Sequence, residues 1–218
     1  MKEVLSLIDT ILENNDETRQ KKNNIIKEAK KLFLEKDYIR SYKLLNEFIS
    51  ETEDADAQGL LGILYEDGLG VQQNIDKAIE YYKKSGEQNN HLSLFYLGAI
   101  YDNGKNVKID FTKAFEYYKK SADLGYPKAQ FNVGCMLESG EGINQDVEKA
   151  IEYYEKAANQ NNADANNSLG VLYMKGEVVE EDIKKAIEYC KISASQGFEA
   201  ARQNLDLIKE AYPELMKN

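Results

Sequence analysis

The hydrophobic and small residues of the chain recur with a period of 36 residues. An aliphatic residue followed by glycine marks each copy: Leu61-Gly62, Leu97-Gly98, Val133-Gly134 and Leu169-Gly170. An alanine then occupies one register position, at Ala78, Ala114, Ala150 and Ala186. An aromatic pair follows it, at Tyr81-Tyr82, Tyr117-Tyr118 and Tyr153-Tyr154, with Tyr189-Cys190 in the last copy. Four copies that align without a gap indicate a repeat protein.

Each copy predicts two antiparallel helices joined by a short loop. In the first copy we expect helices over about residues 55–67 and 74–86. A polar residue that can cap free backbone N–H groups precedes each second helix: Asn74, Asp110, Asp146 and Asp182. A glycine suited to a left-handed turn ends each first helix: Gly68, Gly104, Gly140 and Gly176. Because one short hairpin cannot bury its apolar side alone, the copies must stack into a continuous core.

The glycine in the middle of each first helix calls for a packing explanation. Glycine costs a helix interior about 1 kcal/mol relative to alanine. The four glycines nevertheless keep register, at Gly62, Gly98, Gly134 and Gly170. We therefore expect a neighbouring helix to approach closely at these positions, and we expect that helix to be the one that carries the tyrosines.

The pattern resembles the Sel-1-like repeat, a member of the tetratricopeptide-like α-solenoid group. The residues that carry the resemblance in the first copy are Leu61-Gly62-Ile63-Leu64-Tyr65, Gly68-Leu69-Gly70-Val71 and Lys77-Ala78. The resemblance extends over about residues 55–206. It implies an all-α fold, a right-handed α-α superhelix of about 12 stacked helices. It also implies a role in assembling complexes, in signalling or in bacterial contact with a host.

Two copies depart from the pattern in the loop. Asn106 and Val178 stand where the first and third copies have a second loop glycine, Gly70 and Gly142. Asparagine tolerates a positive φ, whereas a β-branched residue does not. The fourth loop is therefore predicted to follow a different path from the other three.

The pattern also predicts the domain organisation. Residues 1–54 form N-terminal helices, with a tetratricopeptide-like capping hairpin that breaks near Lys36-Asp37. The repeats occupy residues 55–90, 91–126, 127–162 and 163–198, and residues 199–218 form a C-terminal capping helix. The apolar spacing over residues 4–12 predicts an amphipathic helix packed on its own domain. A membrane-surface helix or a dimerising helix is the alternative for that segment.

Charge and cysteine content narrow the class of protein. The net charge of −10 argues against nucleic acid, whose phosphates are bound through clustered lysine and arginine. Two cysteines cannot form a disulfide framework, so they do not indicate an oxidising compartment. The sequence has neither the apolar run of a signal peptide nor that of a membrane span. We therefore expect a cytoplasmic protein that does not insert into a membrane.

Candidate chemistry is scarce in the sequence. No nucleophile, zinc-protease or phosphate-loop motif is present, and His91 is the single histidine. Cys135 and Cys190 occupy positions that are apolar or aromatic in the other copies, so they are expected to act as small hydrophobic residues. We expect no catalytic residue, no metal site and no cofactor.

Recognition is expected at positions that vary between copies but share one face. Counted from the mid-helix glycine as zero, positions −3, +1 and +4 point away from the core-like positions of the first helix. These positions hold Gly59, Ile63 and Glu66; Phe95, Ala99 and Asp102; Phe131, Cys135 and Glu138; and Asn167, Val171 and Met174. Apolar anchors within an acidic rim suit a partner segment with apolar and basic residues. The alternative is that Phe95 and Phe131 only fill space between helices.

The predicted function is that of a non-catalytic interaction module or adaptor that binds a protein or peptide in a concave groove. One alternative is an enzyme, because some cysteine-rich relatives are described as β-lactamases or penicillin-binding proteins. This chain lacks their paired cysteines and a Ser-x-x-Lys nucleophile, and an assay of nitrocefin hydrolysis distinguishes the two. A second alternative is a self-associating structural protein, which light scattering at several concentrations distinguishes.

Overall fold

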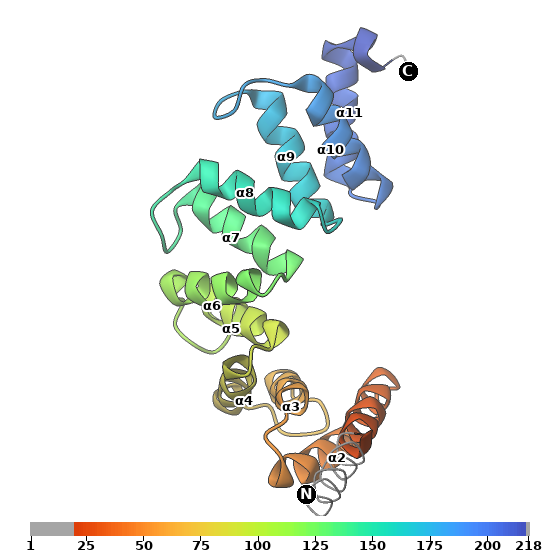
Figure 1. Ribbon diagram of the computed structural model, residues 1–218, viewed down its shortest axis with the longest axis vertical. Coiled ribbons are helices and arrows are strands. Elements are labelled where there is room, and N and C mark those ends of the chain that lie inside the picture. The colour runs from red at the N-terminus through yellow and green to blue at the C-terminus, as the bar shows by residue number, and fades with distance from the viewer. Residues whose placement is uncertain (1–19, 217–218) are drawn as a thin grey trace, which may run out of the picture. The chain divides into compact units, whose positions relative to one another are not determined.

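The computed structural model describes residues 20–216, which are helices, turns and loops with no β-strand among them (Figure 1). The chain divides into two compact units, Met1–Ser93 and Leu94–Asn218. The predicted amphipathic helix over residues 4–12 lies outside the described residues.

The first unit contains the helix over residues 20–34 and then α2 (Tyr38–Glu51), α3 (Ala55–Asp67) and α4 (Ile75–Glu87). The predicted break at Lys36-Asp37 is confirmed, because Lys36 has a φ of 63° and Asp37 caps α2 by accepting from the backbone N–H of Arg40. Leu45, Leu61 and Leu64 are fully buried in the core that joins these helices.

The second unit begins within α5 (His91–Asn103) and continues through α6 (Phe111–Asp123), α7 (Pro127–Ser139) and α8 (Val147–Ala158). It ends with α9 (Ala163–Lys175), α10 (Ile183–Ser195), α11 (Glu199–Ala211) and a 3-10 helix over Pro213–Met216. From α6 onward each α-helix packs against the next, and α11 also contacts α9. The unit is therefore a row of stacked hairpins in chain order.

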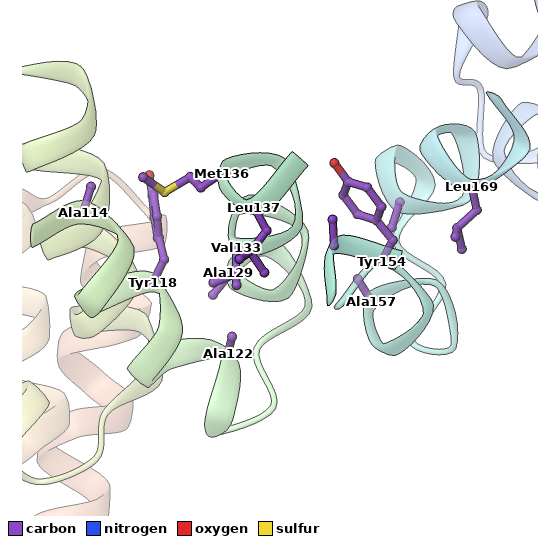
Figure 2. Close-up of a cluster of buried hydrophobic side chains, with 12 residues drawn as sticks. Ala114, Tyr118, Ala122, Ala129, Val133, Met136, Leu137, Tyr154, Ala157 and Leu169 are labelled. Atoms are coloured by element: carbon purple, nitrogen blue, oxygen red, sulfur yellow. The ribbon is translucent and has the colours of Figure 1, made fainter. Parts of the chain in front are cut away.

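One apolar cluster runs through the middle of the second unit. Figure 2 shows Ala129 and Val133 of α7 in its centre, with Tyr118 of α6 on one side and Tyr154 of α8 on the other. The four register alanines of the chain, Ala78, Ala114, Ala150 and Ala186, are all fully buried. The positions that the copies share are therefore the positions that form the stack.

The close approach predicted at the mid-helix glycines is confirmed. A Cβ atom placed on Gly134 would lie 2.5 Å from the ring of Tyr154, and one on Gly98 would lie 2.5 Å from the ring of Tyr118. Gly62 and Tyr82 have the same relationship. In the first three copies the glycine is thus the surface on which the tyrosine of the following helix lies, and this contact fixes the spacing within the hairpin.

The predicted caps and loop departures are also confirmed. Asn74, Asp110, Asp146 and Asp182 each accept a hydrogen bond from the backbone N–H three residues later. Asn106 adopts a positive φ of 58°, as Gly70 and Gly142 do, whereas Val178 is not among the residues of positive φ. The fourth loop therefore differs from the other three in backbone conformation at this position, although it closes with the same bond, from the Asp182 N–H to the Tyr173 carbonyl oxygen.

Candidate functional site

Phe95 and Phe131, the two predicted anchors, are half-buried side chains that lie against tyrosine rings. The centroid of the Phe95 ring is 5.5 Å from that of Tyr118 and 5.2 Å from that of Tyr126. The Phe131 ring is 5.7 Å from that of Tyr154. Each phenylalanine thus packs on the core with part of its surface and leaves the rest accessible.

Asp102 and Glu138, the two predicted rim acids, accept hydrogen bonds from core tyrosines. The Tyr118 hydroxyl donates to Oδ2 of Asp102 at 3.2 Å, and the Tyr154 hydroxyl donates to Oε2 of Glu138 at 2.6 Å. The pKa values of Tyr118 and Tyr154 are raised above the ordinary value for tyrosine, mainly by burial. The neighbouring carboxylates of Asp102 and Glu138 raise them further. These bonds hold the acids at fixed positions rather than as freely rotating surface charges.

The first unit repeats this arrangement, and the fourth copy replaces both partners at once. In the first unit the Tyr82 hydroxyl donates to Oε2 of Glu66 at 2.8 Å. In the fourth copy Cys190 stands in place of the tyrosine and Met174 in place of the acid. A Cβ on Gly170 would lie 2.5 Å from Sγ of Cys190, so the thiol takes over the packing position of the ring. The tyrosine and the acid thus occur together in the first three copies and are both replaced in the fourth.

Within the second unit, a groove of about 370 Å³ lies between the third and fourth copies of the repeat. Glu138 of α7, Gln145 of the following loop and Val147 of α8 form one side. The other side consists of Asn167, Ser168, Val171, Leu172 and Lys175 of α9 and of Glu177 and Val178 in the fourth loop. We refer to this site as the α7–α9 groove.

Three of the predicted recognition residues come together in this groove, namely Glu138, Asn167 and Val171. The remaining predicted residues of the second unit, Phe95, Ala99, Asp102, Phe131, Cys135 and Met174, are half-buried and do not line it. Gly59, Ile63 and Glu66 belong to the first unit. Glu138 lies seven residues after Phe131, two helical turns along the same face of α7.

The walls of the groove combine aliphatic, amide and charged groups. Val147, Val171 and Leu172 supply apolar surface. The side-chain oxygen of Asn167 accepts a hydrogen bond of 3.0 Å from the Asn204 amide, which fixes the orientation of the Asn167 amide in the wall. The charged lining residues are the two acids Glu138 and Glu177 and the one base Lys175. Such a site suits recognition of a short polar backbone that carries an apolar side chain.

The rest of the lining was not predicted, because the prediction covered only positions −3, +1 and +4 of each first helix, whereas Ser168, Leu172 and Lys175 occupy other positions of α9. Gln145 and Val147 come from the loop and the second helix of the third copy, and Glu177 and Val178 come from the fourth loop. The signal for Val178 was present in the sequence as the departure from the loop glycine.

The reactive side chains do not gather into a site in the described part of the chain. Both cysteines are free thiols. Burial raises the pKa of Cys190 to about 11 and also raises that of Cys135, so both remain protonated at neutral pH. His91 is exposed at the first residue of α5. Among residues 20–216 no group of three or more histidine, cysteine or acidic side chains is placed to hold a metal ion.

A family model described as Sel1 repeat matches residues 55–90, 91–126, 127–162 and 163–198. The chain belongs to the Sel1 repeat family. The all-α solenoid expected from the sequence is thereby established, and members of this family serve mainly as protein-interaction modules. Among curated proteins no sequence matches the chain.

Solved structures agree with this assignment. A Sel1 repeat protein from Oxalobacter formigenes is 27% identical, with a TM-score of 0.78 over 86% of this chain and 74% of that one. A protective antigen of uropathogenic Escherichia coli is 28% identical, with a TM-score of 0.74 over 78% of this chain. The match spans 36% of that antigen, about a third of its length. An immunity protein from Pseudomonas aeruginosa, 24% identical over 80% of this chain and 68% of that one with a TM-score of 0.52, shares the fold.

None of the helices within residues 20–216 combines the length and the apolar character needed to cross a bilayer.

Proposed function

We propose that this Sel1 repeat protein is a non-catalytic adaptor that binds an extended segment of a partner protein in the α7–α9 groove. The observation that carries the proposal is the composition of the groove. Its walls include Glu138, Asn167 and Val171, which occupy positions that differ between copies and share one helix face. The mid-helix glycine and the register alanine, which serve the stack, are instead the same residue in all four copies, so the groove is where this chain differs from a generic repeat.

The partner segment carries apolar and basic residues. Apolar side chains are favoured by the aliphatic walls, since burying such surface contributes about 25 cal/mol per Å². Basic residues are favoured by Glu138 and Glu177, which outnumber Lys175 in the lining, and by the net charge of −10 on the whole chain. Complementary charge raises the association rate and disfavours acidic partners.

Phe95 and Phe131 extend the binding surface beyond the groove. Both rings are half-buried, so each can contribute apolar area to a partner without leaving the core. Aromatic anchors of this kind often supply a large share of the binding energy at protein interfaces. The partner segment therefore runs along the first helices of successive copies rather than ending at one pocket.

We place the protein in the cytoplasm. Support comes from Cys135 and Cys190, which are both free thiols, since a reducing compartment keeps thiols in this state.

The proposal is tested by selecting short random peptides that bind the immobilised full-length protein. Peptides with an aliphatic residue close to lysine or arginine are expected to be enriched. Val171→Lys places a charge in the groove wall and is expected to abolish this enrichment. Ile192→Lys makes the same kind of change on the exposed surface of α10 and serves as the matched control. Failure to enrich any peptide, or equal enrichment by Val171→Lys, would contradict the proposal.

A further inference from the structure

The position of Val178 in the repeat explains why a hollow exists at this junction. Gly70, Asn106, Gly142 and Val178 share one register position in the loop after the first helix. Of these, Gly70, Asn106 and Gly142 have positive φ values of 68°, 58° and 74°. Val178, with its branched Cβ, does not adopt this conformation. The fourth loop therefore cannot take the turn that the third loop takes.

The turn at Gly142 brings the third loop onto the start of the preceding second helix. A Cβ on Gly142 would overlap the carbonyl group of Phe111, the first residue of α6. The Thr112 hydroxyl also donates to the carbonyl oxygen of Gly142 at 3.3 Å. Gly70 approaches Tyr38 and Ile39, at the start of α2, in the same way. In two copies, then, the loop glycine allows direct contact between backbones.

The residue that corresponds to Phe111 in the next copy is Val147, the first residue of α8. By register, the fourth loop would pack on Val147 as Gly142 packs on Phe111. Val147 and Val178 instead both line the α7–α9 groove, and the Val178 side chain is 47% exposed. The hollow thus occupies the place where a loop glycine makes backbone contact in two other copies.

We propose that the valine at position 178 opens a side-chain pocket in which one aliphatic residue of the partner segment is bound, next to a basic residue. This inference rests on the proposed function and names the residue that determines its specificity. The pocket offers the methyl groups of Val147, Val171 and Val178 to the aliphatic side chain, and the carboxylates of Glu138 and Glu177 to the neighbouring base. Its volume of about 370 Å³ is near the lower end of the range for ligand sites, roughly 300–1,000 Å³. This volume suits one or two side chains rather than a folded domain.

The decisive comparison is between Val178→Gly and Val178→Ala in the full-length protein. Glycine permits the positive φ, so the fourth loop is expected to close onto Val147 and fill the pocket. Alanine shortens the side chain, but a positive φ remains unfavourable for it. The loop is therefore expected to keep its present conformation, and the pocket stays open. With a peptide enriched on the original protein as probe, Val178→Gly is expected to lower affinity roughly tenfold or more. Val178→Ala is expected to change affinity by less than about threefold, because only two methyl groups are lost.

A measurement without peptide tests the loop closure separately. A soluble paramagnetic probe broadens the methyl resonances of residues that it can reach. The Val147 methyl groups are expected to be broadened in the original protein and in Val178→Ala, and protected in Val178→Gly. Circular dichroism melts of both variants confirm that each is folded.

The outcomes separate this inference from the proposed function. If no peptide is enriched on the original protein, both are wrong. If Val178→Gly binds the enriched peptide as tightly as the original protein does, the pocket assignment is wrong and the adaptor function stands. If the Val147 methyl groups stay equally accessible in Val178→Gly, the loop-closure argument is wrong. If replacing the aliphatic residue of the peptide by serine weakens binding to the original protein but not to Val178→Gly, the pocket is supported.

Discussion

The Tyr154 hydroxyl donates a 2.6 Å hydrogen bond to Oε2 of Glu138, while the same tyrosine ring lies directly against Gly134. Tyr154 is fully buried in the core, and Glu138 lines the α7–α9 groove. One side chain therefore connects the packing of the repeat to the orientation of a binding-site acid. The groove is held by the stack, so it is expected to keep its shape without a ligand.

The Tyr154–Glu138 bond is expected to contribute measurably to stability. Tyr154→Phe and Glu138→Gln should each lower the free energy of unfolding in urea. Their double-mutant cycle should give a coupling energy of about 1 kcal/mol, because the two groups form one partly buried, charge-assisted hydrogen bond. A cycle that pairs Tyr154→Phe with Glu152→Gln, on the exposed face of α8, should give no coupling. Equal coupling in the two cycles would contradict the assignment.

Gly134→Ala is expected to destabilise the protein although alanine favours helices. The new Cβ would lie 2.5 Å from the Tyr154 ring, and overpacking of this kind typically costs about 1–3 kcal/mol. That cost outweighs the gain of roughly 1 kcal/mol in helix propensity. Urea unfolding measures the net change in the free energy of unfolding. The variant Ala200→Gly, on the exposed surface of α11, measures the contribution of helix propensity alone. A Gly134→Ala variant as stable as the original would show that the ring contact is not tight.

Stability is expected to fall as the pH rises from about 9 to 11. Burial raises the pKa of the Cys190 thiol from 9.0 to about 11, so the unfolded chain loses this proton at a lower pH than the folded chain does. The stabilisation is complete below about pH 9 and is lost as the pH approaches the folded pKa. The pKa of Tyr154, raised mainly by burial, acts in the same direction above pH 10.0.

Urea unfolding at a series of alkaline pH values measures this effect. Cys190→Ala removes one of the titrating groups, so this variant should lose less stability than the original protein over the same interval. Identical pH profiles for the two proteins would show that the buried thiol does not contribute.

The double variant Phe95→Ala, Phe131→Ala is expected to fold but to bind the partner segment more weakly. Replacing a fully buried phenylalanine by alanine lowers the free energy of unfolding by about 3–5 kcal/mol. Replacing each of these half-buried rings should lower it by less. Titration calorimetry with an enriched peptide measures the affinity, and circular dichroism measures the fold. A folded double variant with full affinity would limit the binding surface to the groove.

Much of the fold follows from the repeat itself. The mid-helix glycines, the register alanines and the polar caps recur because each serves a contact that every copy makes, so their spacing reveals the hairpin. The groove is harder to predict, since it depends on what differs between copies. Val178 was recognisable as a departure from the loop glycine. That this departure leaves Val147 uncovered could not be predicted without knowing which helix end the loop packs on. That relationship joins residues 31 positions apart and becomes visible only once the helices are stacked.

Mapping the bound peptide by methyl chemical shifts tests the location of binding most directly. The full-length protein, labelled at valine and leucine methyl groups, is titrated with a peptide enriched by selection. The largest shifts are expected at Val147, Val171, Leu172 and Val178, the aliphatic walls of the α7–α9 groove. Shifts concentrated instead at Leu34 in the helix over residues 20–34, or at Leu207 of α11, would contradict this location, because both residues are exposed and neither lines the groove.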